Sequence, residues 1–288
     1  MKAAAVDIGT NSMRLLITHK VGDGLVELGR YERVTGLGRG VDSTGELGEE
    51  AIDRTLLALS EFGGRMREAG VEHRRAVATS ASRDARNREG FFDRAELALG
   101  VRPELISGDE EAALAFAGAT SRASVPGPHL VVDIGGGSTE FVTVEGGRSF
   151  DIGSVRLTDR ILTDRPAPAD QLIAARALVA EMLLPVTAFV GSVMGVAGTW
   201  TSLARIEHGP DRPDLHQLSR DQIGALVGRL AALTEEQTAA LPGLDPARAP
   251  VILGGAVIAE GAAAAVGTQT VTVSEHDLLD GVVASLLR

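Results

Sequence analysis

The chain has 288 residues, of which 44% are hydrophobic and 23% are charged, a composition typical of a globular protein rather than a disordered one. The lack of cysteine excludes disulfide scaffolds, cysteine-based zinc sites and thiol catalysis. A net charge of −11 argues against nucleic acid as a partner, but it leaves anionic small substrates open, because local fields in a cleft can oppose the net charge.

The first half of the chain alternates short strands with helical patterns, which is typical of an α/β fold. Strands are predicted at residues 3–7, 12–18, 25–33, 76–78 and 105–106, helical segments over 48–69, 82–99 and 107–120, and an inter-domain linker at 121–128.

The second half continues in the same way. Strands are predicted at residues 129–133, 138–144, 148–152, 193–197, 251–253 and 271–274, and helices over 169–184, 221–233 and 277–287. Residues 182–204 carry no charge and are long enough to span a bilayer, but Pro185 and several glycines favour a helix end, a buried strand and a loop. With no signal peptide at the N-terminus, we expect a cytoplasmic protein without membrane attachment.

An internal repeat links the two halves. The segments DIGTNSMRLLI and DIGGGSTEFVTV begin 126 residues apart, at Asp7 and Asp133, and each runs from the end of one predicted strand through a turn into the next. Two copies of one strand–turn–strand unit indicate a duplicated domain with a cleft between the copies.

The two glycine-containing turns are candidate phosphate sites, because glycine lets backbone N–H donors approach an anion closely. The side chains of Asn11, Ser12, Ser138 and Thr139 add donors, and the carboxylates of Asp7 and Asp133 are suited to Mg²⁺ or its waters. A lone turn of this kind also fits a plain hairpin. No Gly-Lys pair is present for a Walker loop, and a strand rather than a helix is predicted after Gly135, Gly136 and Gly137, which excludes a Rossmann turn.

Two further segments carry candidate chemistry. In SGDEEA, Ser107 and Glu110 predict a capping box, which leaves Glu111 on another helix face as a candidate base for an attacking water, or as a solvated surface residue. In TSASRDARN, Arg83 follows a strand and is a candidate phosphate contact, or one member of a surface cluster of arginines. Gly198 and Gly254–Gly255 are expected at strand-to-helix turns.

Over nearly its whole length the sequence resembles the exopolyphosphatase/guanosine pentaphosphate phosphohydrolase (Ppx/GppA) family of the actin–Hsp70–sugar kinase superfold. The motifs that carry the resemblance are DIGTNSMRLLI, ATSASRDARN, SGDEEA, VVDIGGGSTE and GSVRLT, followed by the weaker GTWTSL, GGAVI and SEHDLLDG. The implied fold is α/β, with two duplicated actin-like (ribonuclease H-like) domains and a cleft between them. The implied domains are 1–117 plus 275–288, and 118–274.

The resemblance also implies roles for individual residues. Glu111 matches the family's general base, Arg83 a phosphate contact, and Asn11 and Ser12 its first phosphate loop. Asp133 and Glu140, which bracket the second glycine turn, match positions linked to the metal and the substrate. The implied cofactor is Mg²⁺, and the implied assembly is a homodimer.

The leading hypothesis is therefore hydrolysis of the terminal phosphoryl group of inorganic polyphosphate. Longer members of the family carry an extra helical region, so we expect this chain to prefer shorter polymers. The alternatives are hydrolysis of the 5′ γ-phosphate of pppGpp, an ATP-dependent sugar kinase, and a non-catalytic sensor of (p)ppGpp or polyphosphate.

Overall fold

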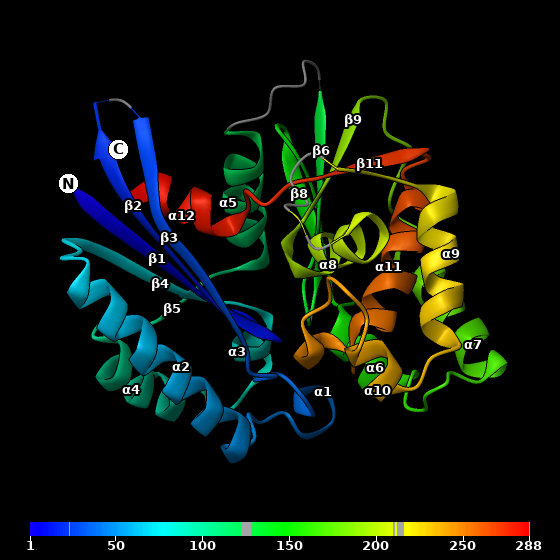
Figure 1. Cartoon of the computed structure of the whole chain (residues 1–288), viewed down its shortest axis with the longest axis horizontal. Coiled ribbons are helices and arrows are strands. Elements are labelled where there is room, and N and C mark those ends of the chain that lie inside the picture. The colour runs from blue at the N-terminus through cyan, green and yellow to red at the C-terminus, as the bar shows by residue number, and fades with distance from the viewer. Residues whose placement is uncertain (23, 122–127, 210, 212–215, 288) are drawn as a thin grey trace. The chain divides into compact units, whose positions relative to one another are not determined.

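A computed structural model describes residues 1–22, 24–121, 128–209, 211 and 216–287. The chain divides into two compact units, residues 1–121 with 277–288 and residues 122–276 (Figure 1). Each unit has one mixed sheet with helices packed against it. All but the two ends of the predicted linker at 121–128 lies outside the described residues.

The first unit contains a five-stranded sheet with the strand order β3-β2-β1-β4-β5. Its strands are β1 (Lys2–Ile8), β2 (Ser12–Val21), β3 (Gly24–Val34), β4 (His73–Ala78) and β5 (Glu104–Leu105). Its helices are α1 (Val41–Thr44), α2 (Glu49–Glu68), α3 (Ser80–Asp84), α4 (Arg88–Leu99), α5 (Gly108–Thr120) and α12 (Leu278–Leu286).

Alternation along β1 decides which helices each residue meets. Ala4, Val6 and Ile8 belong to the core that includes α2 and α4, whereas Ala3 and Ala5 belong to a second core with α5 and α12. Because successive side chains of a strand point to opposite faces, Asp7 lies on the α5 and α12 side of the sheet. That side therefore carries the polar group at the end of β1.

The second unit contains a six-stranded sheet with the order β10-β11-β9-β6-β7-β8. Its strands are β6 (His129–Ile134), β7 (Thr139–Thr143), β8 (Gly146–Phe150), β9 (Ser192–Val196), β10 (Gln217–Ser219) and β11 (Thr270–Val273). Its helices are α6 (Ser154–Arg160), α7 (Ala169–Met182), α8 (Ala197–His208), α9 (Arg220–Ala231), α10 (Glu235–Ala239) and α11 (Ile252–Ala265), with a 3₁₀ turn, η1 (Pro246–Arg248).

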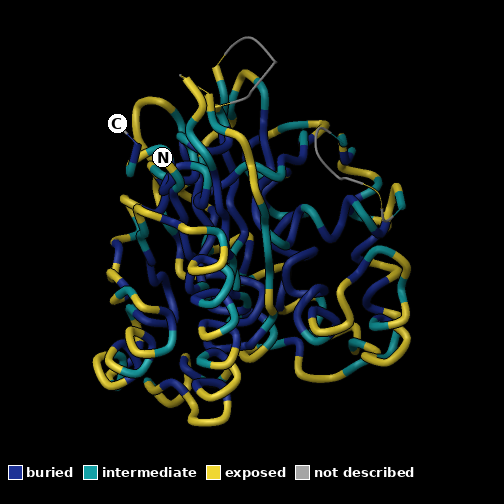
Figure 2. Tube along the Cα trace, turned by 60° about the vertical axis from the view of Figure 1, so that its left-hand side comes forward, coloured by how far each residue is buried: buried dark blue, intermediate teal, exposed yellow. Residues whose placement is uncertain are grey.

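The two sheets repeat one arrangement. Strands β1 and β2 form an antiparallel pair beside a parallel partner, β4, and strands β6 and β7 form the same pair beside β9. The expected duplicated α/β fold is confirmed. Most exposed residues lie on outer turns and on the outer surfaces of helices (Figure 2).

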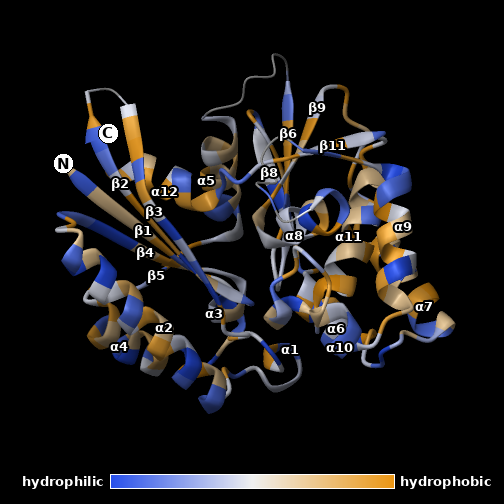
Figure 3. Cartoon of the chain, in the orientation of Figure 1, coloured by the Kyte–Doolittle hydropathy of each residue, from blue (hydrophilic) through white to orange (hydrophobic). Residues whose placement is uncertain are grey.

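One expected strand is wrong. Residues 252–253, predicted as a strand, begin the helix α11, so Gly254 and Gly255 lie inside its first turn. α11 packs against α6, α7, α8 and α9, and apart from Glu260 it consists of apolar residues and glycine (Figure 3). Its first eight residues are all buried and show no polar face, so its start cannot be told from a buried strand by periodicity.

The uncharged segment at residues 182–204 contains the last residue of α7, all of β9 and the first part of α8, as expected. Among the described residues, no helix combines the length and the hydropathy that crossing a bilayer requires.

Glycines allow α5 and α12 to pack backbone against backbone. A Cβ at Gly118 would overlap the carbonyl of Asp277, and a Cβ at Gly281 would overlap the carbonyl of Leu114. Neither neighbour is the end of a flexible side chain, so the two helices must separate to admit a methyl group.

We therefore expect Gly118→Ala to lower the free energy of unfolding by about 1–3 kcal/mol, the usual range for overpacking. The matched control is Gly90→Ala in α4, where the added Cβ meets no atom within 4 Å apart from its chain neighbours and its own helix backbone. This control should gain up to about 1 kcal/mol from helix propensity. Urea unfolding of both variants checks the prediction, and equal effects would contradict it.

Candidate active site

The turn after β1 is closed by its own backbone. The Gly9 amide donates to the Ser12 carbonyl at 3.1 Å, and the Asn11 carbonyl accepts from Thr35 and Gly36 at 3.0 and 2.9 Å. The Asn11 side chain is buried, and neither its oxygen nor its nitrogen has a partner among the described residues. Because buried amide groups are nearly always hydrogen-bonded, this side chain is suited to a ligand.

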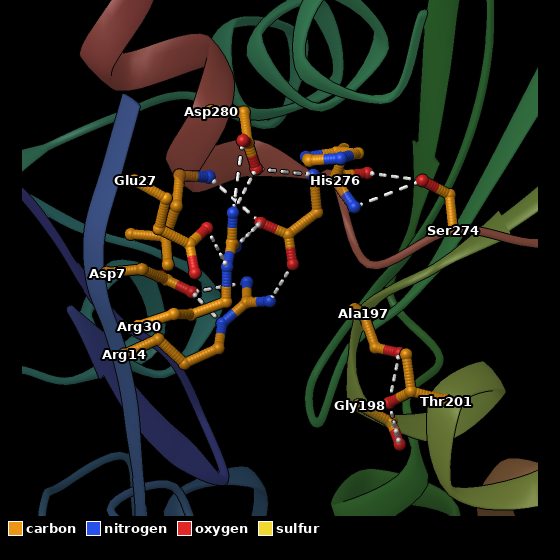
Figure 4. A network of polar contacts seen from close by, with 12 residues as sticks. Asp7, Arg14, Glu27, Arg30, Ala197, Gly198, Thr201, Ser274, His276 and Asp280 are labelled. Atoms are coloured by element: carbon orange, nitrogen blue, oxygen red, sulfur yellow. Dashed lines mark hydrogen bonds and ion pairs between the residues drawn. The ribbon is translucent and has the colours of Figure 1, made fainter. Parts of the chain in front are cut away.

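Asp7, at the end of β1, is paired across the sheet with Arg14 of β2. Arg14 donates to Asp7 Oδ2 from Nε at 3.0 Å and from Nη2 at 2.6 Å, whereas Asp7 Oδ1 is buried without a partner in the described part of the chain. Figure 4 shows Asp7 and Arg14 joined in this way. Burial raises the pKa of the Asp7 carboxyl, against the opposing effect of the Arg14 guanidinium.

Glu111 lies in the first turn of α5 and is 8% exposed. Its Oε2 accepts from Arg83 Nη1 at 2.7 Å, and the same nitrogen donates to the Ile106 carbonyl at 3.1 Å. Of the three guanidinium nitrogens of Arg83, only Nη1 has a partner among the described residues. Nε and Nη2 can therefore donate to an anion. The structure thus brings together the predicted base and the predicted phosphate contact.

Burial also sets the protonation of Glu111. Desolvation raises the pKa of the Glu111 carboxyl above its ordinary value of 4.5, and the nearby charge of Asp7 adds to the rise, while Arg83 and Arg14 oppose it. A carboxylate with a raised pKa holds a proton more strongly, which favours its use as a general base.

The capping box predicted at Ser107 forms only by half. The Ser107 side chain accepts from the Glu110 amide at 3.1 Å, as expected. The Glu110 carboxylate instead binds Arg75 at 2.7 Å. Consecutive helical residues point about 100° apart, so Glu110 and Glu111 meet different arginines.

The turn after β6 repeats the first one. The Gly135 amide donates to the Ser138 carbonyl at 3.0 Å, which is the counterpart of the Gly9–Ser12 bond. The first amides of α6 donate to the carbonyls of Gly135 and Gly136, from Ser154 at 3.0 Å and from Val155 at 2.8 Å. The amides of Gly136, Gly137 and Ser138 have no main-chain acceptor among the described residues, so this loop is a candidate cradle for an anion.

Thr139 differs from the expectation that its hydroxyl binds phosphate. The side chain is fully buried, and its hydroxyl donates to the Ile152 carbonyl at 2.6 Å. That proton is therefore used inside the unit, and Ser138 is the hydroxyl of this turn that fits a phosphate better.

Asp133 and Glu140 are cross-strand neighbours on β6 and β7, and they are 5% and 1% exposed. Leu130, Val132 and Ile134 belong to the core of the unit, so the alternation puts Asp133 on the opposite face. Ser149 donates to Glu140 Oε1 at 2.7 Å. Two adjacent buried carboxylates are oxygen ligands of the kind that Mg²⁺ takes.

The fit to Mg²⁺ differs between the units. No group of three or more His, Cys, Asp or Glu side chains in the described residues is arranged to hold a metal alone, but Mg²⁺ is usually held by one or two carboxylates together with water and phosphate oxygens. Asp133 and Glu140 fit that pattern. At the pairing position of Glu140, the first unit has Arg14, so Asp7 offers a metal only Oδ1.

The sequence patterns did not identify the residues that hold these side chains in place. Arg14 is part of the motif DIGTNSMRLLI but was given no role there, although the pairing of β1 with β2 places it beside Asp7. Arg156, whose Nε donates to the Gly137 carbonyl at 2.9 Å, lies on the unforeseen helix α6. Asp277 reaches Arg14 across 263 residues, and no local pattern reveals such a contact.

Comparisons with known proteins agree with these observations. The family profile described as "Ppx/GppA phosphatase family" matches residues 16–288. The chain is 40% identical to Exopolyphosphatase 2 of Mycobacterium tuberculosis, over 99% of this chain and 98% of that one.

Solved structures give the same result. An exopolyphosphatase-like protein has a TM-score of 0.92 and 38% identity, covering 99% of this chain and 98% of its own. An exopolyphosphatase from Cytophaga hutchinsonii has a TM-score of 0.90 and 30% identity, covering 100% of this chain and 98% of its own.

The raised pKa of Glu111 has a consequence for stability that needs no substrate. The folded state favours the protonated carboxyl of Glu111. The contribution of this group to the free energy of unfolding is therefore fully present below pH 4.5 and is lost as the pH rises through its raised folded pKa. We expect the stability of the wild-type chain, relative to Glu111→Gln, to decrease across that window. Urea unfolding of both proteins between pH 4 and pH 8 measures the free energy of unfolding of the wild type minus that of the variant. A value that stays constant or rises with pH would contradict the prediction.

Proposed function

The chain belongs to the Ppx/GppA phosphatase family, and we propose that it is an exopolyphosphatase, which removes the terminal phosphoryl group of inorganic polyphosphate as orthophosphate. The observation that carries the proposal is the buried Glu111 with its raised pKa and its bond to Arg83. The names of the similar proteins supply the substrate class.

The chemistry begins with water. Glu111 accepts a proton from the attacking water, whose oxygen bonds to the terminal phosphorus as the bridging P–O bond breaks. Orthophosphate and a polymer shorter by one unit leave. Such transfers depend on positioning and on charge stabilisation, and the free Nε and Nη2 of Arg83 supply donors for the transferred group.

The remaining donors bind the phosphate. In the second unit these are the amides of Gly136, Gly137 and Ser138, and in the first unit the side-chain amide of Asn11. The hydroxyls of Ser12 and Ser138 are added from the sequence pattern.

The residues present fit a divalent cation. Asp133 and Glu140 of the second unit would hold Mg²⁺, and in the first unit Oδ1 of Asp7 is an oxygen of the kind that a cation takes. When bound, the ion neutralises negative charge on the phosphate chain. The proton that leaves the attacking water goes to Glu111.

Replacing the base is the direct test of the activity. We expect Glu111→Gln to lower kcat by about 10²–10⁴, the range for loss of a general base. The matched control is Glu110→Gln, since Glu110 is exposed and binds Arg75, and its kcat should stay within about twofold of the wild type. Phosphate release from the purified chain with Mg²⁺ measures both.

The same assay separates the alternatives when short polyphosphate, long polyphosphate, pppGpp and ATP are compared in parallel. Faster release from pppGpp would make the chain a pppGpp phosphohydrolase. Transfer from ATP to a sugar would favour a kinase. Tight binding of (p)ppGpp or polyphosphate without turnover would favour a sensor. The preference for shorter polymers stays a prediction that the two polyphosphate arms test.

Metal dependence has its own test. Asp133→Asn should raise the Mg²⁺ concentration needed for half-maximal rate by about tenfold or more, because one of two carboxylate ligands loses its charge. Excess EDTA should stop phosphate release, and added Mg²⁺ should restore it. An unchanged Mg²⁺ requirement in the variant would remove Asp133 from the metal site.

The homodimer expected from the family resemblance and the cytoplasmic location expected from the N-terminal sequence stay predictions. Light scattering after size-exclusion chromatography tests the homodimer, and cell fractionation tests the cytoplasmic location.

A further inference from the structure

Asp277 is the last residue before α12 and is 4% exposed. Its Oδ1 accepts from the Leu279 amide at 3.0 Å and so caps the helix. Its Oδ2 accepts from Nη1 of Arg14. One carboxylate thus serves a helix cap through one oxygen and an arginine through the other.

Arg14 stands between two buried carboxylates. It binds Asp277 through Nη1 and Asp7 Oδ2 through both Nε and Nη2, while its own side chain is 14% exposed. Two donors on a single oxygen fix the rotation of the Asp7 carboxylate. Oδ1 of Asp7 is then held in one place, buried and without a partner among the described residues.

The arrangement exceeds what anchoring α12 requires. Asp280 of the same helix binds Arg30 of β3 at 2.9 Å and accepts from the Asp277 amide at 3.1 Å, so a second ion pair already ties α12 to the sheet. Figure 4 shows both arginines beside this helix end. The Asp277–Arg14 contact is the one that leads on to Asp7.

We infer that Arg14, held by Asp277, is a positioning residue that orients Asp7 for the reaction. This inference rests on the proposed function. Where the second unit has the carboxylate of Glu140, the duplicated position in the first unit is the cation Arg14, which binds the carboxylates of Asp7 and Asp277. The repeat keeps the backbone and changes the charge, which gives the first unit one oriented carboxylate in place of a pair.

A double-mutant cycle between Asp277 and Asp7 tests the inference in the full chain. Asp277→Asn keeps an oxygen for the helix cap but removes the charge that holds Arg14. We expect it to lower kcat for phosphate release by about tenfold with KM within about twofold, because a misplaced reacting group costs rate rather than binding. In the Asp7→Asn background the same change should cost less than about twofold.

The matched control is Asp280→Asn, the same substitution three residues further along α12, at a carboxylate that binds Arg30. Its kcat should stay within about twofold of the wild type. Thermal unfolding of every variant identifies changes that only destabilise the fold.

The outcomes separate the inference from the proposed function. Equal kcat losses from Asp277→Asn in both backgrounds, or a wild-type kcat in Asp277→Asn, would overturn the positioning role and leave the hydrolase standing. A wild-type chain that releases no phosphate would overturn the proposed function and the inference with it.

Discussion

Five carboxylates are buried among the described residues, and an ionised carboxylate leaves water only where positive charge or hydrogen-bond donors replace its hydration. They are Asp7, Glu111, Asp133, Glu140 and Asp277. An unpaired ion of this kind costs several kcal/mol, so the surroundings of each are constrained. The groups that contact these carboxylates differ between the two units.

In the first unit, arginines compensate the buried charge. Arg14 serves Asp7 and Asp277, and Arg83 serves Glu111. Arg14 thus ties the end of β1 to the start of α12, and Arg83 ties the first turn of α5 to α3. Burial still outweighs the arginines in raising the pKa of Asp7 and of Glu111. The pairing therefore leaves both groups with a proton affinity above that of an exposed carboxylate.

In the second unit, the corresponding strand pair carries two carboxylates, Asp133 and Glu140, and the Ser149 hydroxyl is among the groups that contact Glu140. The backbone of the turn is the same as in the first unit, closed by the same amide-to-carbonyl bond. Duplication thus preserved the turn, whereas the charge at the paired position diverged. As a result, the first copy has a carboxylate held by an arginine where the second has a pair of carboxylates suited to a cation.

Local patterns predicted most of the strands, the duplicated turns and the helix that begins after Ser107, because alternation, glycine and capping residues act over short distances. They failed for α11, whose first eight residues are all buried and so show no polar face. They also did not reveal the bond from the Thr139 hydroxyl to the Ile152 carbonyl, because that acceptor lies beyond β8. They also could not pair Arg14 with Asp277, since that contact depends on the return of α12 to the first sheet.

The pH dependence of kcat/KM for terminal-phosphate release tests the central claim most directly, that the buried Glu111 is the base. For the wild type, the account predicts an acid limb whose pKa lies above 4.5, since desolvation raises the pKa of this carboxyl. The residual activity of Glu111→Gln should show no such limb. The same acid limb in both proteins would contradict the account.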